Sequence, residues 1–271
     1  MNVDLHLHSD WSDGSMSVPG TVKLAKLLKL DAIAVTDHDT MAHSQMVLDE
    51  GQRQGLRVIP GVEISACDPG TGRKVHLLGY HVRDPQQITG RCRPYLEERH
   101  QAGVQAIERV RAAGYPIDRE DVLSYIGEGG VIYRAHIMRA LAERGYTATI
   151  YGDLYNALFG KNGAAMVQTG YMPVKDALHL IKSAGGFAVL AHPFHYDSMG
   201  LLPELAAWGL DGIEYRHHTQ TPERQAAVQA AAGRHGLFLT GGSDWHGLYS
   251  DKPLPPGAMN VTLPEDHPLL R

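Results

Sequence analysis

This sequence of 271 residues has few cysteines, no long hydrophobic run and no excess of basic residues. Its two cysteines, Cys67 and Cys92, show no C-x-x-C spacing, so a disulfide framework or a thiolate zinc site has little support. Any metal would therefore be held by nitrogen and oxygen atoms. No apolar run approaches the ~20 residues of a membrane span, and Met1 leads into a strand-like run without a signal-peptide pattern. We expect a cytoplasmic protein with no membrane association and no obligate protein partner.

The charge balance and the histidine content limit which kinds of binding site this chain can have. The formal net charge of -5 argues against a general surface for polyanions, although a local basic pocket for one phosphate stays open. Histidine is the unusual residue, because 16 are present and they are scattered along the chain rather than clustered at one end. This distribution favours a built site over an expression tag.

Apolar, β-branched runs alternate with helical patterns through most of the chain. Seven runs predict strands, at residues 3–7, 32–36, 57–64, 75–82, 187–191, 212–215 and 237–240. Helical patterns lie between most of them, at residues 18–30, 41–54, 174–184 and 222–235. This alternation is typical of an α/β fold with a mostly parallel sheet, and seven such strands suggest a TIM-like barrel.

The alternation stops between residues 83 and 167, where no strand is expected. Helical patterns occupy residues 94–113, 119–126, 135–144 and 153–158 of this stretch. We interpret it as a helical insertion between the fourth and fifth predicted strands. The predicted division is a first barrel part at 1–84, the helical insertion at 85–166 and a second barrel part at 167–271.

Candidate metal ligands recur at the ends of the predicted strands. His6 and His8 are two residues apart, so a strand points both rings to the same face. Carboxyl ends of barrel strands are where active sites of such folds assemble. His76 is the exception, because it lies nearer the start of its run. The nine candidates are His6, His8, Asp13, His38, Glu63, His76, His192, Asp244 and His246.

Nine ligands exceed what one ion can bind, so convergence would mean two or three metals with a bridging carboxylate such as Glu63. An imidazole and carboxylate set suits Mn²⁺, which we expect here, with Fe²⁺ or Zn²⁺ as alternatives. Clustered divalent ions activate a water as hydroxide and hold the oxygens of a phosphoryl group. The set therefore predicts phosphate ester hydrolysis, with Glu63, His192 and Asp244 as catalytic residues.

Five motifs resemble, in order and spacing, those of the PHP (polymerase and histidinol phosphatase) phosphoesterase family. They are DLHLHS at residues 4–9, TDHD at 36–39, GVE at 61–63, AHP at 191–193 and GSDWH at 242–246. Within this family the chain is most similar to bacterial nucleoside 3′,5′-bisphosphate phosphatases and 5′-to-3′ exoribonucleases acting on short RNA. Those proteins carry an Arg-x-His motif in a helical insertion, which Arg134-Ala135-His136 matches.

The resemblance implies a distorted (β/α)₇ barrel with a trinuclear site and a phosphate contact from the insertion. One metal would be held by His6, His8, Glu63 and Asp244, a second by Glu63, His76 and His192, and a third by Asp13, His38 and His246. Asp13 stands where some relatives have histidine, a difference that would either weaken the third site or shift its preference toward Mn²⁺. Arg134 and His136 would bind the substrate phosphate, with the guanidinium as a bidentate fork. The insertion would then form a lid over the substrate.

The sequence departs from the family pattern near the predicted phosphate contacts. Relatives often have glycine and arginine after the motif that ends at Pro193, where this chain has Phe194 and His195. A His-Thr-Pro-Glu segment of relatives is matched by residues 220–223, which lack the histidine, and His217 lies close enough to replace it. We therefore predict His195 and His217 as further phosphate contacts.

The expected activity is release of phosphate from a nucleoside 3′,5′-bisphosphate such as pAp, giving AMP, with short single-stranded RNA as a second class of substrate. One alternative is a phosphatase for histidinol phosphate or another small phosphomonoester. The other is a metal-binding module without catalysis. Outside the ligand set, Asp37 is expected to orient a ligand histidine, and His43 to lie on the solvated surface.

Overall fold

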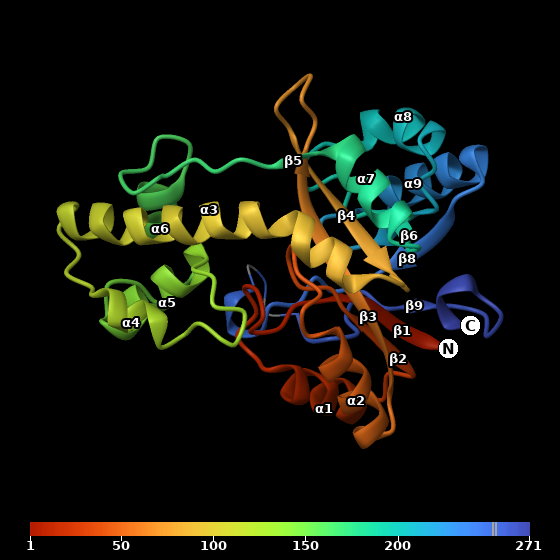
Figure 1. Cartoon of the computed structure of the whole chain (residues 1–271), viewed down its shortest axis with the longest axis horizontal. Helices are drawn as coiled ribbons and strands as arrows, with labels where there is room; N and C mark the ends of the chain where they lie inside the picture. Colours follow the sequence, from red (N-terminus) through yellow and green to blue (C-terminus); the bar gives the residue numbers. More distant parts are fainter. Residues whose placement is uncertain (251, 253) are drawn as a thin grey trace.

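The computed structural model describes residues 1–250, 252 and 254–271, and its strands form one sheet that curls into a nearly closed barrel (Figure 1). The strands are β1 (Asn2–Leu7), β2 (Ala32–Val35), β3 (Arg57–Cys67), β4 (Lys74–Tyr80), β5 (Met172–Pro173), β6 (Phe187–Leu190), β7 (Gly212–Arg216), β8 (Phe238–Gly241) and β9 (Val261–Thr262). Their order is β8-β7-β6-β4-β3-β2-β1-β9, with β5 beside β3. The predicted α/β barrel is confirmed, and only the two-residue strands β5 and β9 were not expected.

The strand β4 runs antiparallel to both of its neighbours in the barrel. Pairing is parallel for β1–β2, β2–β3, β6–β7 and β7–β8, whereas β4 pairs antiparallel with both β3 and β6. The start of β4 therefore lies at the same rim as the carboxyl ends of the parallel strands. His76, near that start, pairs with Ser65 near the end of β3. This reversal explains why His76 was the one candidate at the beginning of its run.

The barrel closes between β1 and the segment that follows β8. The Asp244 N–H donates to the His6 carbonyl over 3.0 Å, and the His8 N–H donates to the Trp245 carbonyl over 2.9 Å. At the other end of β1, the short strand β9 pairs antiparallel with it. Closure at the rim thus places the last ligand motif directly beside the first.

Helices cover the barrel on two sides (Figure 1). They are α1 (Val18–Leu27) and α2 (Ser44–Gln54) on one side, and α7 (Val174–Ser183), α8 (Leu202–Ala207) and α9 (Pro222–His235) on the other. Val18 and Val22 of α1 pack against Ile33 and Val35 of β2, which is the amphipathic packing that the helical pattern predicts. The six-residue helix α8 was not expected.

The insertion begins with α3 (Pro85–Ala112), a helix of 28 residues that starts nine residues before the predicted position at Pro94. The Asp84 side chain caps it by accepting the Gln87 N–H over 3.0 Å, and Pro85 occupies the first turn, where a missing N–H costs nothing. Pro94 lies inside the helix on its exposed side. Water can hydrogen-bond the carbonyl that this proline leaves unpaired, so the helix continues through it.

The shorter helices of the insertion gather at the far end of α3 (Figure 1), where their side chains form a small apolar core. The helices α4 (Arg119–Leu123), α5 (Arg134–Glu143) and α6 (Asp153–Phe159) pack there around residues such as Ile107, Ile137 and Leu141. The chain then returns to the barrel at β5. The domain boundaries given above stay a prediction.

The amino ends of the strands are covered by the carboxyl-terminal segment. Leu269 and Leu270 join the cluster of Leu5 and Tyr80, and the Leu270 carbonyl accepts a hydrogen bond from Arg57 at the start of β3. The opposite rim, where the candidate ligands lie, is left free of this segment. Over the described ranges, we find no helix with both the length and the apolar content needed to cross a membrane.

Candidate metal centre

His6 and His8 lie buried at the carboxyl end of β1, and their rings face the same two carboxylates. The His6 Nε2 atom is 3.2 Å from Glu63 Oε2 and 3.3 Å from Asp244 Oδ1. The His8 Nε2 atom is 3.1 Å and 3.2 Å from the same two oxygens. Strand pairing thus brings four donors from distant parts of the chain within 4.8 Å of one another.

A second group of donors gathers around Asp13, in the loop after β1. His246 Nε2 is 3.3 Å from Asp13 Oδ1, and His38 Nε2 is 3.9 Å from Asp13 Oδ2. His8, whose ring stacks on that of His246 at 4.0 Å, completes the group. Gly14 permits this loop to fold back, because a Cβ there would lie 2.6 Å from the His8 carbonyl oxygen.

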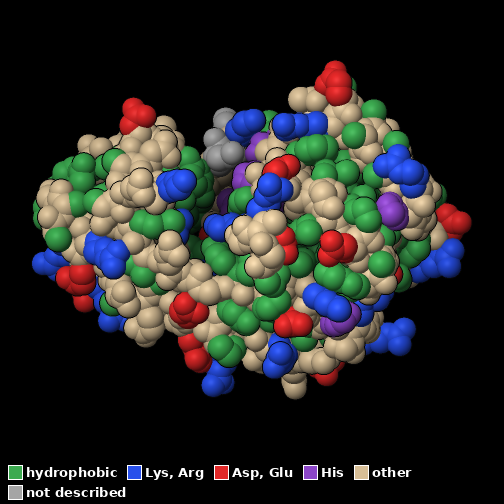
Figure 2. Space-filling view, turned by 90° about the horizontal axis from the view of Figure 1, so that it is seen from above, with side chains coloured by type: hydrophobic (Ala, Val, Ile, Leu, Met, Phe, Trp, Pro, Cys, Tyr) green, Lys and Arg blue, Asp and Glu red, His purple; other side chains and the backbone are tan. Residues whose placement is uncertain are grey.

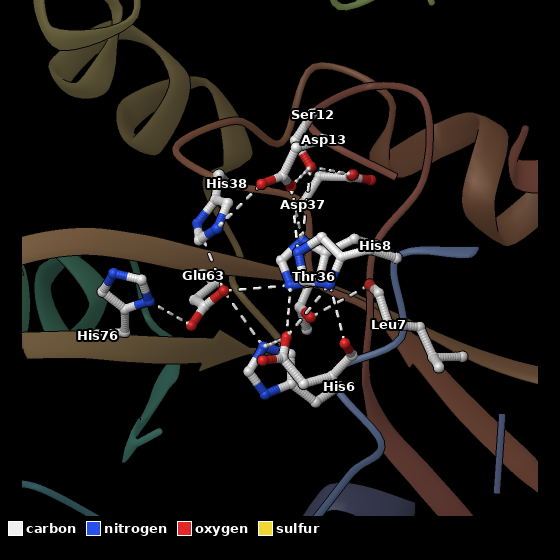
Figure 3. A network of polar contacts seen from close by, with 12 residues as sticks. His6, Leu7, His8, Ser12, Asp13, Thr36, Asp37, His38, Glu63 and His76 are labelled. Carbon is white, nitrogen blue, oxygen red and sulfur yellow. Dashed lines mark hydrogen bonds and ion pairs between the residues drawn. The ribbon is translucent and has the colours of Figure 1, made fainter. Parts of the chain in front are cut away.

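Glu63 lies at the centre of the cluster, with its two oxygens turned to different neighbours (Figure 3). Oε1 is 2.7 Å from His76 Nδ1 and 2.8 Å from His192 Nε2, while Oε2 faces His6 and His8. Oε2 is also 3.4 Å from His38 Nδ1. The structure therefore brings all nine predicted ligands into one cluster, and their assignment to individual metals stays a prediction.

Several buried donor atoms of the cluster lack hydrogen-bond partners, which a bound cation would supply. The Nε2 atoms of His6 and His8 and Oδ1 of Asp244 are buried, and in the described part of the chain they make no hydrogen bond. Burying unsatisfied polar atoms is costly, and a divalent cation would satisfy all three together. Neutral imidazole and carboxylate are ligands that Mn²⁺, Fe²⁺ and Zn²⁺ accept.

Proton binding and cation binding compete at this cluster. Burial opposes protonation of His8, but its interactions with Asp244 and Glu63 outweigh burial and raise the pKa of His8 to about 10. Burial lowers the pKa of His76 to about 3, so that ring is neutral. A cation would therefore displace protons from some rings and find others ready to bind.

Two of the candidate ligands sit on strained backbone. His192 has φ of 22° and Asp244 has φ of 53°, values that non-glycine residues rarely adopt. The His192 N–H donates to Glu214 Oε2 over 2.8 Å, and the Asp244 N–H is held by the His6 carbonyl. Such strain persists only where the surrounding structure enforces it, which is characteristic of functional sites.

Glu214, on β7, is a residue of this site that the sequence interpretation missed. Its carboxylate is fully buried, with Oε1 3.3 Å from His6 Nδ1 and Oε2 accepting the His192 N–H. It therefore orients the ring of one candidate ligand and the backbone of another. The available signal was a carboxylate inside the otherwise apolar run of residues 212–215.

Asp37 supports the loop after β1, as expected of a residue that orients a ligand. It accepts hydrogen bonds from Ser9 and from Ser12 Oγ, and Ser12 Oγ is 3.4 Å from His8 Nδ1. His43 Nε2 lies 2.8 Å from Asp37, and its ring stacks on Trp11. The expectation that His43 lies on the solvated surface is wrong, because this ion-pair geometry and the stacked indole bury it.

A buried ion pair connects the insertion to the residue after His38. Arg99 of α3 donates to Asp39 Oδ2 over 2.9 Å, and its guanidinium lies 5.1 Å from the Tyr133 ring centroid. Asp39 Oδ1 in turn accepts the Ser65 N–H over 2.8 Å. The loop that carries His38 is thus fixed to the barrel and to the insertion together.

The four predicted phosphate contacts have different surroundings. Arg134 lines the cavity and contacts only Met166 Sδ and the Phe159 ring, with no carboxylate partner among the described residues. His195 also lines the cavity and is exposed. Both therefore lie where a substrate anion can reach them.

The two other predicted contacts are fully buried. His136 Nδ1 accepts the Tyr133 N–H over 3.2 Å, which leaves the ring proton on Nε2, a donor without a partner in the described structure. His217 instead has Nδ1 at 2.8 Å from Thr219 Oγ1 and Nε2 at 3.3 Å from Asp244 Oδ2. Neither His136 nor His217 is among the described residues that line the cavity, and both nitrogens of His217 already have partners.

A cavity leads from the donor cluster to the insertion. Figure 2 shows a hollow between the lobe of insertion helices and the barrel, with histidine side chains inside it. Its aromatic lining comes from both sides, and sequence reasoning had not placed these residues there: Tyr133, Tyr151, Tyr155, Phe159, Tyr171 and Tyr196. Lys74, at the start of β4, lines it as well and was also missed.

Fold and site together define a metal-dependent phosphoric ester hydrolase, and comparison with known proteins agrees. Residues 4–82 match the family model described as PHP domain. The chain is 37% identical over 251 residues to phosphoribosyl 1,2-cyclic phosphate 1,2-diphosphodiesterase of Eggerthella lenta, covering 92% of this chain and 96% of that protein. The chain belongs to the PHP family.

Other relatives are named for different substrates, and each name describes hydrolysis of a phosphate ester. The 5′-3′ exoribonuclease Rnm of Salmonella typhimurium is 31% identical, over 90% of this chain and 84% of that protein. The 3′,5′-nucleoside bisphosphate phosphatase of Chromobacterium violaceum is 29% identical, over 90% and 87%. A solved structure from Bifidobacterium adolescentis, assigned as a metal-dependent phosphoesterase, superposes with a TM-score of 0.84 at 31% identity, over 92% of this chain and 89% of that one.

Proposed function

We propose that this protein hydrolyses a phosphate ester of a ribose that carries a second phosphate, as in a nucleoside 3′,5′-bisphosphate such as pAp or a phosphoribosyl cyclic phosphate. The observation that carries this proposal is that two adjoining cavities share part of their lining, including His38, His76 and Lys74. One opens onto the donor cluster and the other extends under the insertion, where Arg134 has no carboxylate partner among the described residues. Two of the relatives are named for substrates of this kind.

We assign the metal ligands as the family resemblance implies. His6, His8, Glu63 and Asp244 would hold one ion, Glu63, His76 and His192 a second, and Asp13, His38 and His246 a third. Bound divalent ions lower the pKa of a water and neutralise charge on phosphoryl oxygens. We propose Mn²⁺ as the working metal, because a mixed set of imidazoles and carboxylates suits it and the third set includes the carboxylate of Asp13.

The chain's own residues position the substrate. Arg134 offers a planar pair of N–H donors to a phosphate, and His136 offers an Nε2–H whose tautomer the Tyr133 N–H fixes. The tyrosines that line the cavity exclude water and give a ribose or base apolar surface to pack against. Glu63, His192 and Asp244 remain the proposed catalytic residues, because they lie at the centre of the donor cluster.

Short RNA is the second candidate substrate, favoured by the likeness to the exoribonuclease and by the opening of the cavity to solvent between the lobes (Figure 2). A phosphatase for histidinol phosphate remains the alternative for a substrate with one phosphate. A module without catalysis is set aside, because the named relatives are enzymes. We also propose that the protein acts in the cytoplasm.

A panel of substrates tests the proposal. Phosphate or mononucleotide release would be followed with pAp, phosphoribosyl 1,2-cyclic phosphate, a short 5′-phosphorylated RNA and histidinol phosphate, each with Mn²⁺. We expect turnover of the first two and its loss in Asp244→Asn, which removes one anionic donor. Preference for histidinol phosphate, or full activity of Asp244→Asn, would contradict the assignment.

A further inference from the structure

Lys74 is a cation of the cavity wall that the metal centre does not use. It is the first residue of β4, two residues before His76. Side chains two apart on a strand share a face, at a spacing of about 6.7 Å along it. The Lys74 side chain therefore projects from the same face of β4 as His76, one two-residue repeat along the strand from it.

The surroundings of Lys74 orient its charge without neutralising it. The Nζ atom lies 5.1 Å from the Tyr171 ring centroid and 5.7 Å from that of Tyr196. Across residues 1–250, 252 and 254–271 no carboxylate forms an ion pair with it, whereas Lys182 is paired with Asp211. An ammonium held between two aromatic rings and facing a cavity is ready to receive an anion.

The charge of Lys74 acts on the tyrosine beside it. Burial opposes ionisation of the Tyr171 phenol, yet the charge and hydrogen bond of Lys74 outweigh burial and lower the pKa of Tyr171. Arg99 contributes in the same direction. Arg134 reaches the same cavity from the insertion, so cations approach it from both walls.

We propose that Lys74 selects substrates with two anionic groups by binding the phosphate that is not cleaved, opposite Arg134. This inference rests on the proposed function, since it places the reacting phosphate at the donor cluster. The two phosphates of one ribose lie several ångströms apart, which matches one strand repeat between His76 and Lys74. An ammonium serves as a point charge here, whereas Arg134 supplies the directional fork.

Steady-state kinetics of Lys74→Met test this role. We expect its KM for pAp to rise at least about tenfold, the effect of losing one charged hydrogen bond, with kcat little changed. The kcat/KM for p-nitrophenyl phosphate, which has one phosphate, should not change. Lys74→Arg should recover much of the loss. Lys23→Met, on the exposed side of α1, is the matched control and should behave as the wild type on both substrates.

Calorimetric titration of pAp into the wild type and Lys74→Met separates this inference from the proposed function. If the wild type binds pAp but does not hydrolyse it, and Lys74→Met binds at least about tenfold more weakly, the proposed function fails and the anion site stands. Equal losses on both substrates, unchanged kinetics and binding in Lys74→Met, or no binding of pAp to the wild type would each overturn the role of Lys74.

Discussion

Glu63 and Glu214 are two buried carboxylates of one site whose surroundings differ. Glu63 faces the rings of five histidines: His6, His8, His38, His76 and His192. Burial opposes its ionisation, but these rings, His76 first, hold the pKa of Glu63 well below its ordinary value. Glu214 lies behind the cluster and contacts one ring and one backbone N–H. The first is placed to bind cations, and the second to position the groups that do.

Glu214→Gln should weaken metal binding more than it weakens the chemical step. The amide keeps one acceptor oxygen and presents an N–H₂ group in place of the other, so either His6 Nδ1 or the His192 N–H loses its acceptor and its orientation. We expect Mn²⁺ affinity to fall by about 10- to 100-fold, with most activity recovered at saturating metal. Metal titration monitored by activity and by calorimetry measures this. Glu204→Gln, on the exposed surface of α8, is the control. Unchanged affinity, or a loss that excess metal does not recover, would contradict the positioning role.

At the scale of the elements, α3 connects the barrel to the insertion through Arg99. The guanidinium is 15% exposed and Asp39 only 3%, so the pair is shielded from water. Burial opposes the Arg99 charge, but Asp39 outweighs burial and raises the pKa of Arg99 further. Arg93 and Glu97 form an ion pair on the same helix, at 75% and 65% exposure.

Arg99→Met should lower the free energy of unfolding by about 3 kcal/mol, because it leaves the Asp39 carboxylate buried without a partner. Arg93→Met should cost below about 1 kcal/mol, because solvent screens the exposed pair. Chemical denaturation of the two variants makes the comparison on one helix. Adding Asp39→Asn to Arg99→Met should restore part of the loss. Equal costs for Arg93→Met and Arg99→Met would show that the buried pair does not hold the insertion to the barrel.

At the scale of the whole molecule, metal binding should couple stability to pH. The His8 pKa is about 10 when folded against an ordinary value of 6.5. Its proton therefore stabilises the metal-free protein fully below pH 6.5, and this contribution is lost as pH rises toward 10. The lowered pKa values of Asp13, Glu63 and Asp244 stabilise above their ordinary range, and that contribution is lost in acid.

The difference in Tm between Mn²⁺-loaded and chelator-treated protein should therefore grow from pH 6.5 to 9. Over this range protons leave the imidazoles, metal competes with fewer of them, and a ligand that binds only the folded state stabilises it further. Thermal unfolding at several pH values, with and without chelator, measures the difference. A constant difference across this range would argue against imidazole ligands.

Much of the fold and of the candidate site could be predicted, because the sequence patterns that indicate them are local. Alternation of strand and helix patterns predicted the barrel, and the period of two in β1 predicted that His6 and His8 share a face. Ligand residues at strand ends predicted the cluster, since parallel strands end at one rim. Misplacing the start of α3 had a local cause too, because the exposed position of Pro94 could not be seen from the residue type alone.

The sequence by itself determined the fold class and which residues could bind metal, because strand period, helix period and donor chemistry are properties of neighbouring residues. Only the tertiary structure decided that β4 is antiparallel to β3 and β6, which brings His76 and Lys74 to the rim where the parallel strands end. It also decided that His217 faces Asp244, that His43 faces the buried Asp37, and that Glu214 stands behind His6. These facts depend on strand direction and on contacts between residues far apart in the chain, which no short stretch of sequence encodes.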